Sequence, residues 1–459
     1  MVAGTASHAG KSWFATAICR YLRRRGVRVA PFKAQNMSNN SYPCKEGGEI
    51  GRAQVAQAEA CGLEPSASMN PILLKPNSAT GSQVIVDGKV WRTLSGREYY
   101  EHFEYLNGRV MAAYERLAAE YEYIVMEGAG SVTEMNLKRT DLVNLGLARR
   151  VGAPALLVAD IDRGGVFASL VGTFALLEPA ESNLVRSFAI NRFRGDASLF
   201  EDGVEFIEDK IGRKCLGVFP HAPDIHLDAE DSVSLDAATR GNGQVAILRF
   251  PRVSNITDFS AVRGAVWIDR PAGRQFETVI LPGSKNVIGD LEWMRSRGLD
   301  RWLLAQHAAG ARLIGVCGGY QMLGERIDDP YQVESAAGSA AGLGLLPVTT
   351  TLETEKTTRV TEAETPGGRR FTAYEIHVGR TVTPNGAEPF AFAGREPEGI
   401  RHGRVMGTYL HGAFEDPAVR QELLGEGCVD RESKDAMYDR LADWFERNGD
   451  MRRFEELYL

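Results

Sequence analysis

The sequence predicts an α/β protein with two domains, each built on a parallel sheet. Short β-rich apolar runs alternate with helical stretches along the whole chain, which is the pattern of parallel-sheet proteins. At 459 residues the chain is too long for a single core, so two or three domains are expected. Two glycine-rich loops, one at the start of the chain and one around Cys317, each follow an apolar run and precede a helical stretch.

The apolar runs fall into two groups. The first group consists of residues 27–30, 123–126, 155–159, 188–191 and 216–219, and the second of residues 245–248, 265–268, 278–281 and 313–316. The polar stretch 236–243 separates them, so we expect one domain over residues 1–238 and a second over residues 244–459. Residues 431–459 are charged and amphipathic and predict a terminal helix pair, which we assign to the second domain.

The composition excludes several kinds of partner. The chain is 44% hydrophobic and 25% charged, and its net charge of −7 provides no basic field for nucleic acid or an anionic membrane. Six scattered cysteines without a CxxC pair argue against a zinc site or disulfide framework and favour a reducing compartment. No apolar run approaches the ~18–20 residues that cross a bilayer, and the start lacks a secretory-signal layout. We therefore expect a cytoplasmic protein, and the sequence predicts no particular oligomeric state.

The first glycine-rich loop has the composition of a phosphate cradle. It reads Gly4-Thr5-Ala-Ser-His-Ala-Gly10-Lys11-Ser12, and the backbone N–H groups of such a loop bind anionic oxygens at a helix N-terminus. Lys11 would reach the terminal phosphates of ATP, and the Ser12 hydroxyl would ligate Mg²⁺. The two glycines lie one residue further apart than in the common form of this loop. A simple glycine-rich turn is the alternative.

The surroundings of this loop support the phosphate interpretation. The following stretch carries its apolar residues on one helical face: Phe14, Ala17, Ile18, Tyr21 and Leu22. Glu127, directly after the run 123–126, is expected as a second Mg²⁺ ligand, with a solvated strand end as the alternative. Only three residues precede Gly4, whereas strands usually have about five. Either the first strand is abbreviated or the true start lies upstream, and we favour the second explanation.

The second glycine-rich loop predicts a nucleophile. Gly315-Val-Cys317-Gly318-Gly319 has the small-x-nucleophile-x-small pattern of a sharp strand-to-helix turn. The glycines relieve crowding, and a helix N-terminus behind the sulfur favours the thiolate. A buried structural cysteine is the alternative. Because a thiolate attacks acyl carbons, its presence beside a phosphate loop indicates a synthetase that activates with ATP and takes nitrogen from an amide.

Longer strings resemble known families. The wide spacing of the first loop resembles dethiobiotin synthetase and its relatives. The chain is also similar, over essentially its whole length, to the cobyric acid synthase family, through the strings Lys33-Ala-Gln35-Asn36-Met37, Gly48-Glu49-Ile-Gly51-Arg52-Ala-Gln54, Met69-Asn70-Pro71, Leu74-Lys75-Pro76, Asp160-Ile-Asp162-Arg163-Gly164-Gly165 and Ile190-Asn191-Arg192. This resemblance implies amidation of the b, d, e and g carboxylates of adenosylated cobyrinic acid a,c-diamide, a corrinoid, with L-glutamine as nitrogen donor. It implies no tightly bound prosthetic group.

The resemblance also implies roles for single residues. Phosphate and metal would be handled by Lys11, Ser12, Lys33 and Glu127, and Asn191 matches the position where relatives hold adenine. The catalytic cleft would be lined by Gln35, Asn36, Glu49, Gln54, Asp160, Asp162 and Arg163. For Asp160 to Arg163 the alternative is a polar loop after a strand, and for Gln35 and Asn36 it is a pair of loop-capping amides.

The second half resembles class I glutamine amidotransferases, which implies a flavodoxin-like domain. Gln321 fits that family, and the backbone of Gly283 and Gly318 would contribute to an oxyanion hole. His411 lies at the general-base position, although a structural histidine is the alternative. The acid that often follows two residues later is replaced by Ala413, so another group must orient His411.

A further string, Tyr374-Glu375-Ile-His377, resembles one in the cobyric and cobyrinic amidases. Glu375 is therefore a candidate to orient the base and His377 a candidate site residue, with a polar strand face as the alternative. Two rival functions stay open. The first is a cobyrinic acid a,c-diamide synthase, which would amidate other corrinoid carboxylates. The second is a ParA/MinD-like ATPase switch, which would have no use for Cys317 and would need a basic, apolar terminal helix.

Overall fold

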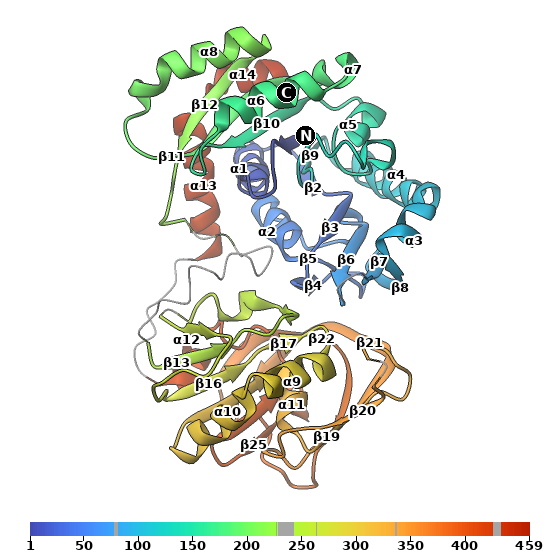
Figure 1. The fold of residues 1–459 in the computed structure, drawn as a ribbon, viewed down its shortest axis with the longest axis vertical. Helices are drawn as coiled ribbons and strands as arrows, with labels where there is room; N and C mark the ends of the chain where they lie inside the picture. The colour runs from blue at the N-terminus through green and yellow to red at the C-terminus, as the bar shows by residue number, and fades with distance from the viewer. Residues whose placement is uncertain (78–80, 226, 228–242, 263, 336, 426–432) are drawn as a thin grey trace.

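The computed structural model describes residues 1–77, 81–225, 227, 243–262, 264–335, 337–425 and 433–459. Figure 1 shows two α/β units one above the other, with the blue and green elements in the upper unit and the yellow and orange elements in the lower. The expected boundary at residues 236–243 lies, except for Gly243, outside the described residues. Within the described part of the chain, every helix is too short or too polar to cross a membrane.

A parallel sheet forms the centre of the upper unit. Four strands follow the order β1-β10-β11-β12, and a parallel bridge from Val2 to Glu127 joins them to the parallel pair β2-β9. The strands are β1 (Val2–Gly4), β2 (Val29–Phe32), β9 (Tyr123–Met126), β10 (Ala155–Asp160), β11 (Val185–Phe193) and β12 (Lys214–Pro220). Each apolar run predicted in the first half overlaps one of these strands. Because parallel strands end at the same edge, the residues after β1, β9, β10 and β11 meet there.

Both faces of this sheet are buried, as expected for a parallel sheet. Along β10, Leu156 and Val158 join the core against α1, whereas Leu157 and Ala159 join the core against α6 and α8. The helices of the unit are α1 (Lys11–Arg24), α2 (Arg52–Cys61), α3 (Gly96–Glu101), α4 (Phe103–Glu120), α5 (Leu145–Val151), α6 (Val166–Leu176), α7 (Pro179–Ser182) and α8 (Glu201–Ile211). The predicted apolar face of α1 is confirmed: Phe14, Ala17, Ile18, Tyr21 and Leu22 are all buried.

A smaller mixed sheet extends the upper unit toward the lower one. Its order is β3-β6-β7-β8, with β3 parallel to β6 and the other pairs antiparallel. Its strands are β3 (Gln35–Met37), β6 (Ile72–Pro76), β7 (Gly81–Val86) and β8 (Lys89–Ser95), and beside it lies the antiparallel pair β4 (Ser41–Pro43) and β5 (Glu49–Gly51). The string from Lys33 to Met37 therefore ends in a strand next to the one that holds Leu74-Lys75-Pro76.

The chain ends in the predicted helix pair, α13 (Lys434–Asn448) and α14 (Met451–Tyr458). The expected boundaries assigned these helices to the second domain, whereas in the structure they pack on the upper unit (Figure 1). Phe14 of α1 lies 5.3 Å from Trp444 and 6.0 Å from Phe445, measured between ring centroids. Arg20 forms an ion pair with Asp439 (2.7 Å). The apolar face of α13 thus covers the apolar face of α1, which a boundary drawn along the sequence does not capture.

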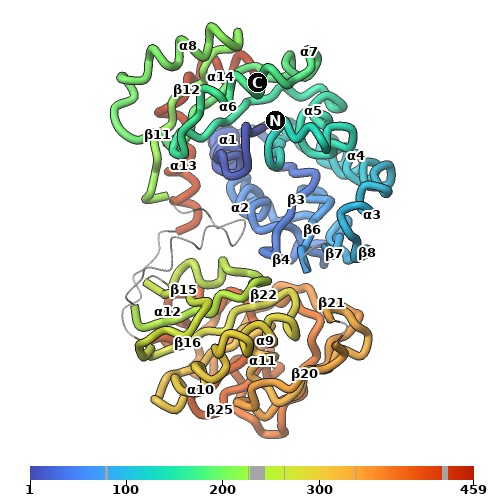
Figure 2. Tube along the Cα trace, viewed as in Figure 1, coloured from blue at the N-terminus to red at the C-terminus, as the bar shows by residue number. Residues whose placement is uncertain are grey.

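The lower unit contains a second parallel sheet, as predicted. Its order is β15-β13-β16-β18-β26-β25, parallel except for β25. The strands are β13 (Val245–Leu248), β15 (Val266–Ile268), β16 (Thr278–Leu281), β18 (Arg312–Val316), β25 (Ile400–His402) and β26 (Val405–Thr408). The helices of this unit are α9 (Val287–Ser296), α10 (Leu299–Ala308), α11 (Gly318–Leu323) and α12 (Pro417–Leu424). Figure 2 traces the same arrangement along the chain.

A long antiparallel hairpin lies beside this sheet and faces the upper unit at one end. Its strands are β21 (Thr349–Glu364) and β22 (Arg370–Val382), with β19 (Arg326–Asp328), β20 (Ser339–Ala341), β23 (Ala391–Ala393) and β24 (Glu396–Glu398) completing the sheet. A short pair, β14 (Val253–Ser254) and β17 (Gly283–Ser284), lies next to the carboxyl edge of the parallel strands. Polar contacts join the two units, among them the Arg52–Glu415 ion pair (2.8 Å).

Candidate functional site

The first glycine-rich loop joins β1 to α1 at the carboxyl edge of the upper sheet. The Thr5 N–H donates to the Val158 carbonyl (3.0 Å), which ties the loop to β10. Gly10 has φ 108°, and a Cβ at this position would lie 2.1 Å from the side-chain nitrogen of Asn191. Asn191 donates to the Ala9 carbonyl (2.9 Å). In this structure Asn191 therefore braces the loop backbone, a contact distinct from the expected one with adenine.

Lys11 and Ser12 begin α1 directly behind the loop. The Lys11 ammonium donates to the carbonyls of Ala6, in the loop itself (3.0 Å), and Gly130, in the segment after β9 (2.9 Å). A cavity of about 590 Å³ opens beside it, a size within the range of small-molecule sites. Its lining includes Lys11, Ser12, Lys33, Gln35 and Asn36. The structure thus brings two predicted phosphate-binding lysines and two predicted cleft residues to one cavity.

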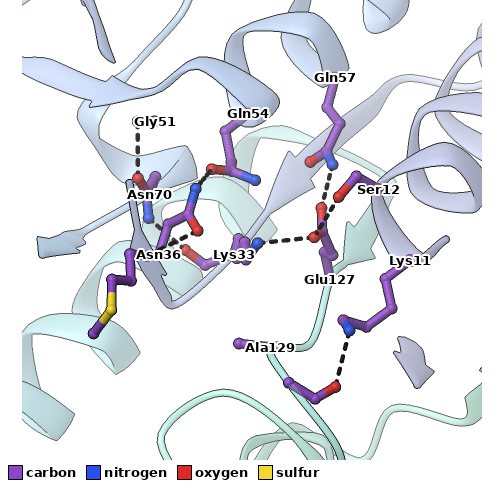
Figure 3. Close-up of polar contacts among 12 residues, drawn as sticks. Lys11, Ser12, Lys33, Asn36, Gly51, Gln54, Gln57, Asn70, Glu127 and Ala129 are labelled. Atoms are coloured by element: carbon purple, nitrogen blue, oxygen red, sulfur yellow. Dashed lines mark hydrogen bonds and ion pairs between the residues drawn. The ribbon is translucent and has the colours of Figure 1, made fainter. Parts of the chain in front are cut away.

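Glu127 is the centre of a buried polar cluster next to this cavity. Its Oε1 accepts hydrogen bonds from Ser12 Oγ (2.9 Å) and Lys33 Nζ (2.8 Å), and its Oε2 accepts one from the Gln57 amide (Figure 3). The carboxylate is only 1% exposed. A carboxylate this deeply buried needs such partners, and the lysine supplies the compensating charge.

Two oxygen-bearing side chains of this cluster are suitable ligands for magnesium. Mg²⁺ prefers hard oxygen ligands and is usually held by one or two protein groups together with phosphate oxygens and water. The Ser12 hydroxyl and the Glu127 carboxylate are such groups, 2.9 Å apart at the end of the cavity where Lys11 lies. No cluster of three or more His, Cys, Asp or Glu side chains suited to a metal occurs among the described residues.

A polar network lines the side of the cavity nearest the lower unit. Asn36 donates to Gln54 Oε1 (2.9 Å), and the Tyr99 hydroxyl donates to Gln35. Gln54 is completely buried, and its amide nitrogen has no hydrogen-bond partner within the described part of the chain. A buried donor without a partner is costly, so the Gln54 amide is a strained part of the network behind Asn36. Asn70 fixes the backbone below by donating to the Lys33 carbonyl (3.0 Å).

The predicted cleft residues at the end of β10 lie outside the lining of the cavity, and the two aspartates pair with arginines. Asp160 pairs with Arg192 (2.8 Å), which itself lines the cavity, and Asp162 pairs with the exposed Arg194 (2.6 Å). Arg163 is exposed in the same loop. Asp160 therefore contacts a cavity residue, whereas Asp162 and Arg163 are exposed and do not line the cavity.

Glu49 lies elsewhere, between the two units. Its Oε2 accepts hydrogen bonds from Lys75 Nζ (2.6 Å) and Ser41 Oγ (2.7 Å), and Lys356 of β21 contacts its other oxygen. Burial alone would raise the pKa of this carboxyl, but Lys356 and Lys75 hold the pKa far below its usual range. The sequence predicted Glu49 in the catalytic cleft, whereas in this structure it is a buried anion that joins the units.

The second glycine-rich loop forms the predicted sharp turn between β18 and α11. Cys317 has φ 53° and ψ −109°, a conformation that few non-glycine residues adopt. A Cβ on Gly315 would lie 2.6 Å from the Gly319 carbonyl oxygen, and a Cβ on Gly319 would lie 2.0 Å from the Leu281 carbonyl oxygen. Both glycines are therefore required by close packing against α11 and β16.

The base predicted for this cysteine lies beside it. Cys317 is near enough to His411 to act on its pKa, and the Nδ1 of His411 lies 2.6 Å from Asp258 Oδ2. Both His411 and Asp258 are 1% exposed. Burial alone would lower the pKa of His411, but the Asp258 charge and hydrogen bond, together with Cys317, raise it to about 10. The arrangement of thiol, imidazole and carboxylate is that of a nucleophile activated by an oriented base.

Asp258, rather than Glu375, is the acid that orients His411. Glu375 accepts a hydrogen bond from Arg359 (2.9 Å) and lies 3.0 Å from His377 Nε2, so the expected role of Glu375 does not fit this geometry. These two predicted site residues form a polar pair on β22. Nothing local in the sequence marks Asp258, because it lies in a 3-10 turn (Ile256–Phe259) that is 153 positions from His411.

The residues expected to bind glutamine or its oxyanion lie around the sharp turn that carries Cys317. A Cβ on Gly283 would lie 3.8 Å from the Cys317 Cβ, and one on Gly318 would lie 2.7 Å from the Ser284 nitrogen, so the backbones of β17 and of the turn after Cys317 pack closely together. Gln321 donates to the Tyr409 hydroxyl (3.1 Å). Its own oxygen is buried and without a hydrogen-bond partner among the described residues.

The fold and these two sites define a class of protein: a nucleotide-binding domain joined to a glutamine amidotransferase domain. Comparison with known protein families supports both domain assignments. Residues 1–234 match the family described as a CobQ/CobB/MinD/ParA nucleotide binding domain, and residues 244–419 match the CobB/CobQ-like glutamine amidotransferase domain.

The most similar of the relatives compared identify one family within this class. Cobyric acid synthase of Syntrophobacter fumaroxidans is 43% identical over 502 residues, covering 100% of this chain and 98% of the relative. That of Dehalococcoides mccartyi is 41% identical over 496 residues (100% and 97%), and that of Jannaschia sp. is 45% identical over 449 residues (95% and 93%). The chain belongs to the cobyric acid synthase family, a family of ATP- and glutamine-dependent amide-forming ligases.

Proposed function

We propose that this chain amidates the b, d, e and g carboxylates of adenosylated cobyrinic acid a,c-diamide to give cobyric acid. The observation that carries the proposal is the presence of two separate sites on one chain. One is the cavity with Lys11, Ser12 and Lys33, and the other is the Cys317–His411 pair with its carboxylate. The first suits phosphoryl transfer, and the second suits release of nitrogen from glutamine. An ATPase switch would need only the first.

The upper site would prime the corrinoid carboxylate. A carboxylate resists attack by an amine because its negative charge repels the nucleophile, and transfer of the ATP γ-phosphoryl group to it creates a good leaving group. Such transfer depends mainly on positioning and charge neutralisation. Lys11 and Lys33 would neutralise phosphate charge, and Ser12 and Glu127 would hold Mg²⁺ when ATP is bound. Gln54, Gln35 and Asn36 would contact the substrate, and Asn191 would keep the loop in shape.

The lower site would supply ammonia. Cys317 Sγ, after giving its proton to His411, would attack the side-chain amide carbon of glutamine, with the backbone N–H groups near Gly283 and Gly318 stabilising the oxyanion. His411 would return the proton to the leaving nitrogen, and Asp258 would keep the ring in the required orientation. Water then releases glutamate from the thioester, and ammonia displaces phosphate from the primed carboxylate. Because water competes for that carboxylate, we propose that ammonia passes internally between the units.

We also propose how the chain is divided between these tasks. Residues 1–238, completed by α13 and α14, would form the synthetase part, and the remaining residues from 244 onward would form the amidotransferase part. The packing of α13 on α1 supports the addition of the terminal helices to the first part.

The direct test is product analysis. The protein is incubated with ATP, Mg²⁺ and glutamine together with either cobyrinic acid or its adenosylated a,c-diamide, and the corrinoids are weighed by mass spectrometry. The proposal predicts four successive amidations of the a,c-diamide. Amidation of cobyrinic acid to the a,c-diamide, with no reaction beyond it, would favour the a,c-diamide synthase alternative.

A further inference from the structure

Tyr374 of β22 contacts both the base of the lower site and the acid that orients it. Its ring stacks on the His411 imidazole, with 18° between the ring planes, and its hydroxyl lies 3.1 Å from Asp258 Oδ1. The main chains of Tyr374 and His411 also exchange two hydrogen bonds (3.1 and 2.9 Å). Burial and the Asp258 charge raise the pKa of Tyr374 well above its usual range, so the hydroxyl keeps its proton and acts as a donor to the carboxylate.

Two residues of the upper unit contact the Tyr374 ring. Tyr42 of β4 lies 4.7 Å from it, measured between ring centroids, and the Arg52 guanidinium at the start of α2 lies 5.9 Å from its centroid. The same guanidinium lies 4.9 Å from the Tyr42 ring. A cation within about 6 Å of an aromatic ring is attracted to its face, most strongly where water is excluded, and Arg52 is only 2% exposed. The cation and the two rings thus form one buried cluster where β4 meets β22 (Figure 1).

Arg52 also contacts the turn that follows His411. Its Nη2 lies 2.8 Å from Glu415 Oε1, and the Glu415 N–H donates to the Gly412 carbonyl (2.9 Å) within that turn. An arginine suits both contacts, because its flat guanidinium stacks on aromatic rings and pairs with carboxylates at the same time. One side chain of the upper unit therefore holds the two segments of the lower unit that flank the imidazole.

The orientation of the imidazole decides whether it can act as a base. One ring nitrogen must face the thiol while the other faces the carboxylate, and a rotation of the ring breaks both contacts. The stacked Tyr374 ring limits that rotation, and its hydroxyl fixes the second oxygen of Asp258. Tyr374 can do so only if its own ring is held in place.

We propose that Arg52 is a positioning residue for glutamine hydrolysis, which holds Tyr374 and the turn after His411 so that the imidazole and Asp258 keep their relative orientation. The upper unit thus supplies a part of the amidotransferase site, and Arg52 acts on the reaction without touching glutamine. This inference rests on the proposed function for the reaction that the lower site catalyses, but not for the contacts themselves.

The test measures kcat and KM for glutamine hydrolysis by the full-length protein, through the release of glutamate. Arg52→Met keeps much of the side-chain volume but removes the cation, and Tyr374→Phe keeps the ring but removes the donor to Asp258. Each change removes a contact of a charged group, so kcat is expected to fall about tenfold in either variant. KM should change by less than about twofold, because the inference gives neither side chain a contact with glutamine.

Arg20→Met is the matched control. Arg20 is also a buried arginine of the upper unit that pairs with a carboxylate, Asp439, but its partner lies on α13 rather than in the lower unit. The control should lower the thermal unfolding temperature and keep the wild-type kcat. Wild-type kcat in Arg52→Met would overturn the inference, as would a higher KM with unchanged kcat or an equal loss of kcat in the control. Loss of the cooperative unfolding transition in Arg52→Met would also overturn it, by making the residue a structural one.

A spectroscopic measurement tests the orientation without the reaction. In protein with isotopically labelled histidine, the Nδ1 proton that His411 shares with Asp258 should give a downfield NMR resonance, assigned by its loss in Asp258→Asn. The resonance is expected to broaden or disappear in Arg52→Met and in Tyr374→Phe and to persist in Arg20→Met. An unchanged resonance in the first two variants would contradict the inference. A wild-type protein that hydrolyses no glutamine would contradict the proposed function instead, and the resonance would still decide the role of Arg52.

Discussion

Asp258 Oδ2 lies 2.6 Å from His411 Nδ1, although 153 positions separate the two residues in the chain. Tyr374 closes the arrangement: its ring stacks on the imidazole (5.0 Å between centroids) and its hydroxyl donates to Asp258 Oδ1 (3.1 Å). The imidazole is therefore fixed on one face and at one nitrogen. This relationship supplies the acid that Ala413 cannot provide.

Replacement of Asp258 should disable the lower site alone. In Asp258→Asn the ring loses the carboxylate that sets its tautomer, so kcat for glutamine hydrolysis is expected to fall between about a hundredfold and ten-thousandfold. Glu375→Gln is the matched control, because that carboxylate pairs with Arg359 and His377, and it should change kcat much less. Steady-state glutamate release measures both. A larger loss in the control would return the orienting role to Glu375.

The same pair should make stability depend on pH. In the folded protein the pKa of His411 is raised from 6.5 to about 10, so the stabilisation is fully present below the lower value and is lost as the pH rises through the higher one. The free energy of unfolding, measured by urea denaturation at intervals between these two values, is expected to decrease with pH more steeply in the wild type than in Asp258→Asn. Parallel pH curves would contradict the assigned pair.

Removal of the Lys11 ammonium should stop synthesis whatever the nitrogen source. Lys11→Ala removes the ammonium beside the first glycine-rich loop, where we propose that the phosphates bind, and in the proposed mechanism phosphoryl transfer precedes the attack by ammonia in either case. Corrinoid amidation is therefore expected to fall to background with glutamine and with ammonium salts. The exposed Lys89→Ala serves as the control for loss of a lysine. Continued synthesis from ammonium by Lys11→Ala would show that this loop does not bind the reacting phosphate.

The terminal helices should stabilise the synthetase part. Phe445 of α13 is completely buried against Phe14 and Phe219, so Phe445→Ala is expected to cost about 3–5 kcal/mol of unfolding free energy. Phe206→Ala, at a site that is 50% exposed, should cost far less. Thermal unfolding is followed together with glutamine hydrolysis and amidation, which shows which part of the protein loses stability. Glutamine hydrolysis lost at a lower temperature than ATP-dependent amidation supplied with ammonium would assign the helices to the other part.

The sequence predicted the parts of the fold that follow local patterns. The apolar runs became the strands of two parallel sheets, and the residues around Cys317 became the expected turn, because close packing leaves no room for side chains at Gly315 and Gly319. The mixed β3-β6-β7-β8 sheet and the long hairpin β21–β22 escaped prediction. In the hairpin, one face is exposed and rich in Thr and Glu, so its apolar alternation is weak.

The features that the sequence did not predict depend on contacts between residues far apart in the chain. Neither Asp258 nor Asn255 belongs to a recognisable string, and their positions next to His411 arise only when β14, the following turn and the segment after β26 come together. The family resemblance of its string implies a place in the cleft for Glu49, but the string gives no sign that Lys356 contacts it from the other unit. The helix pair at the end of the chain was predicted correctly, whereas its partner, α1, lies more than 400 positions away.

The separation of the two tasks is tested most directly by Cys317→Ser, assayed for corrinoid amidation with glutamine and, separately, with a high concentration of ammonium. Since only the thiolate step is removed, the variant should form no amide from glutamine and should match the wild type with ammonium. Equal loss of product from both nitrogen sources would contradict the account, because the sulfur would then be needed for more than the release of ammonia.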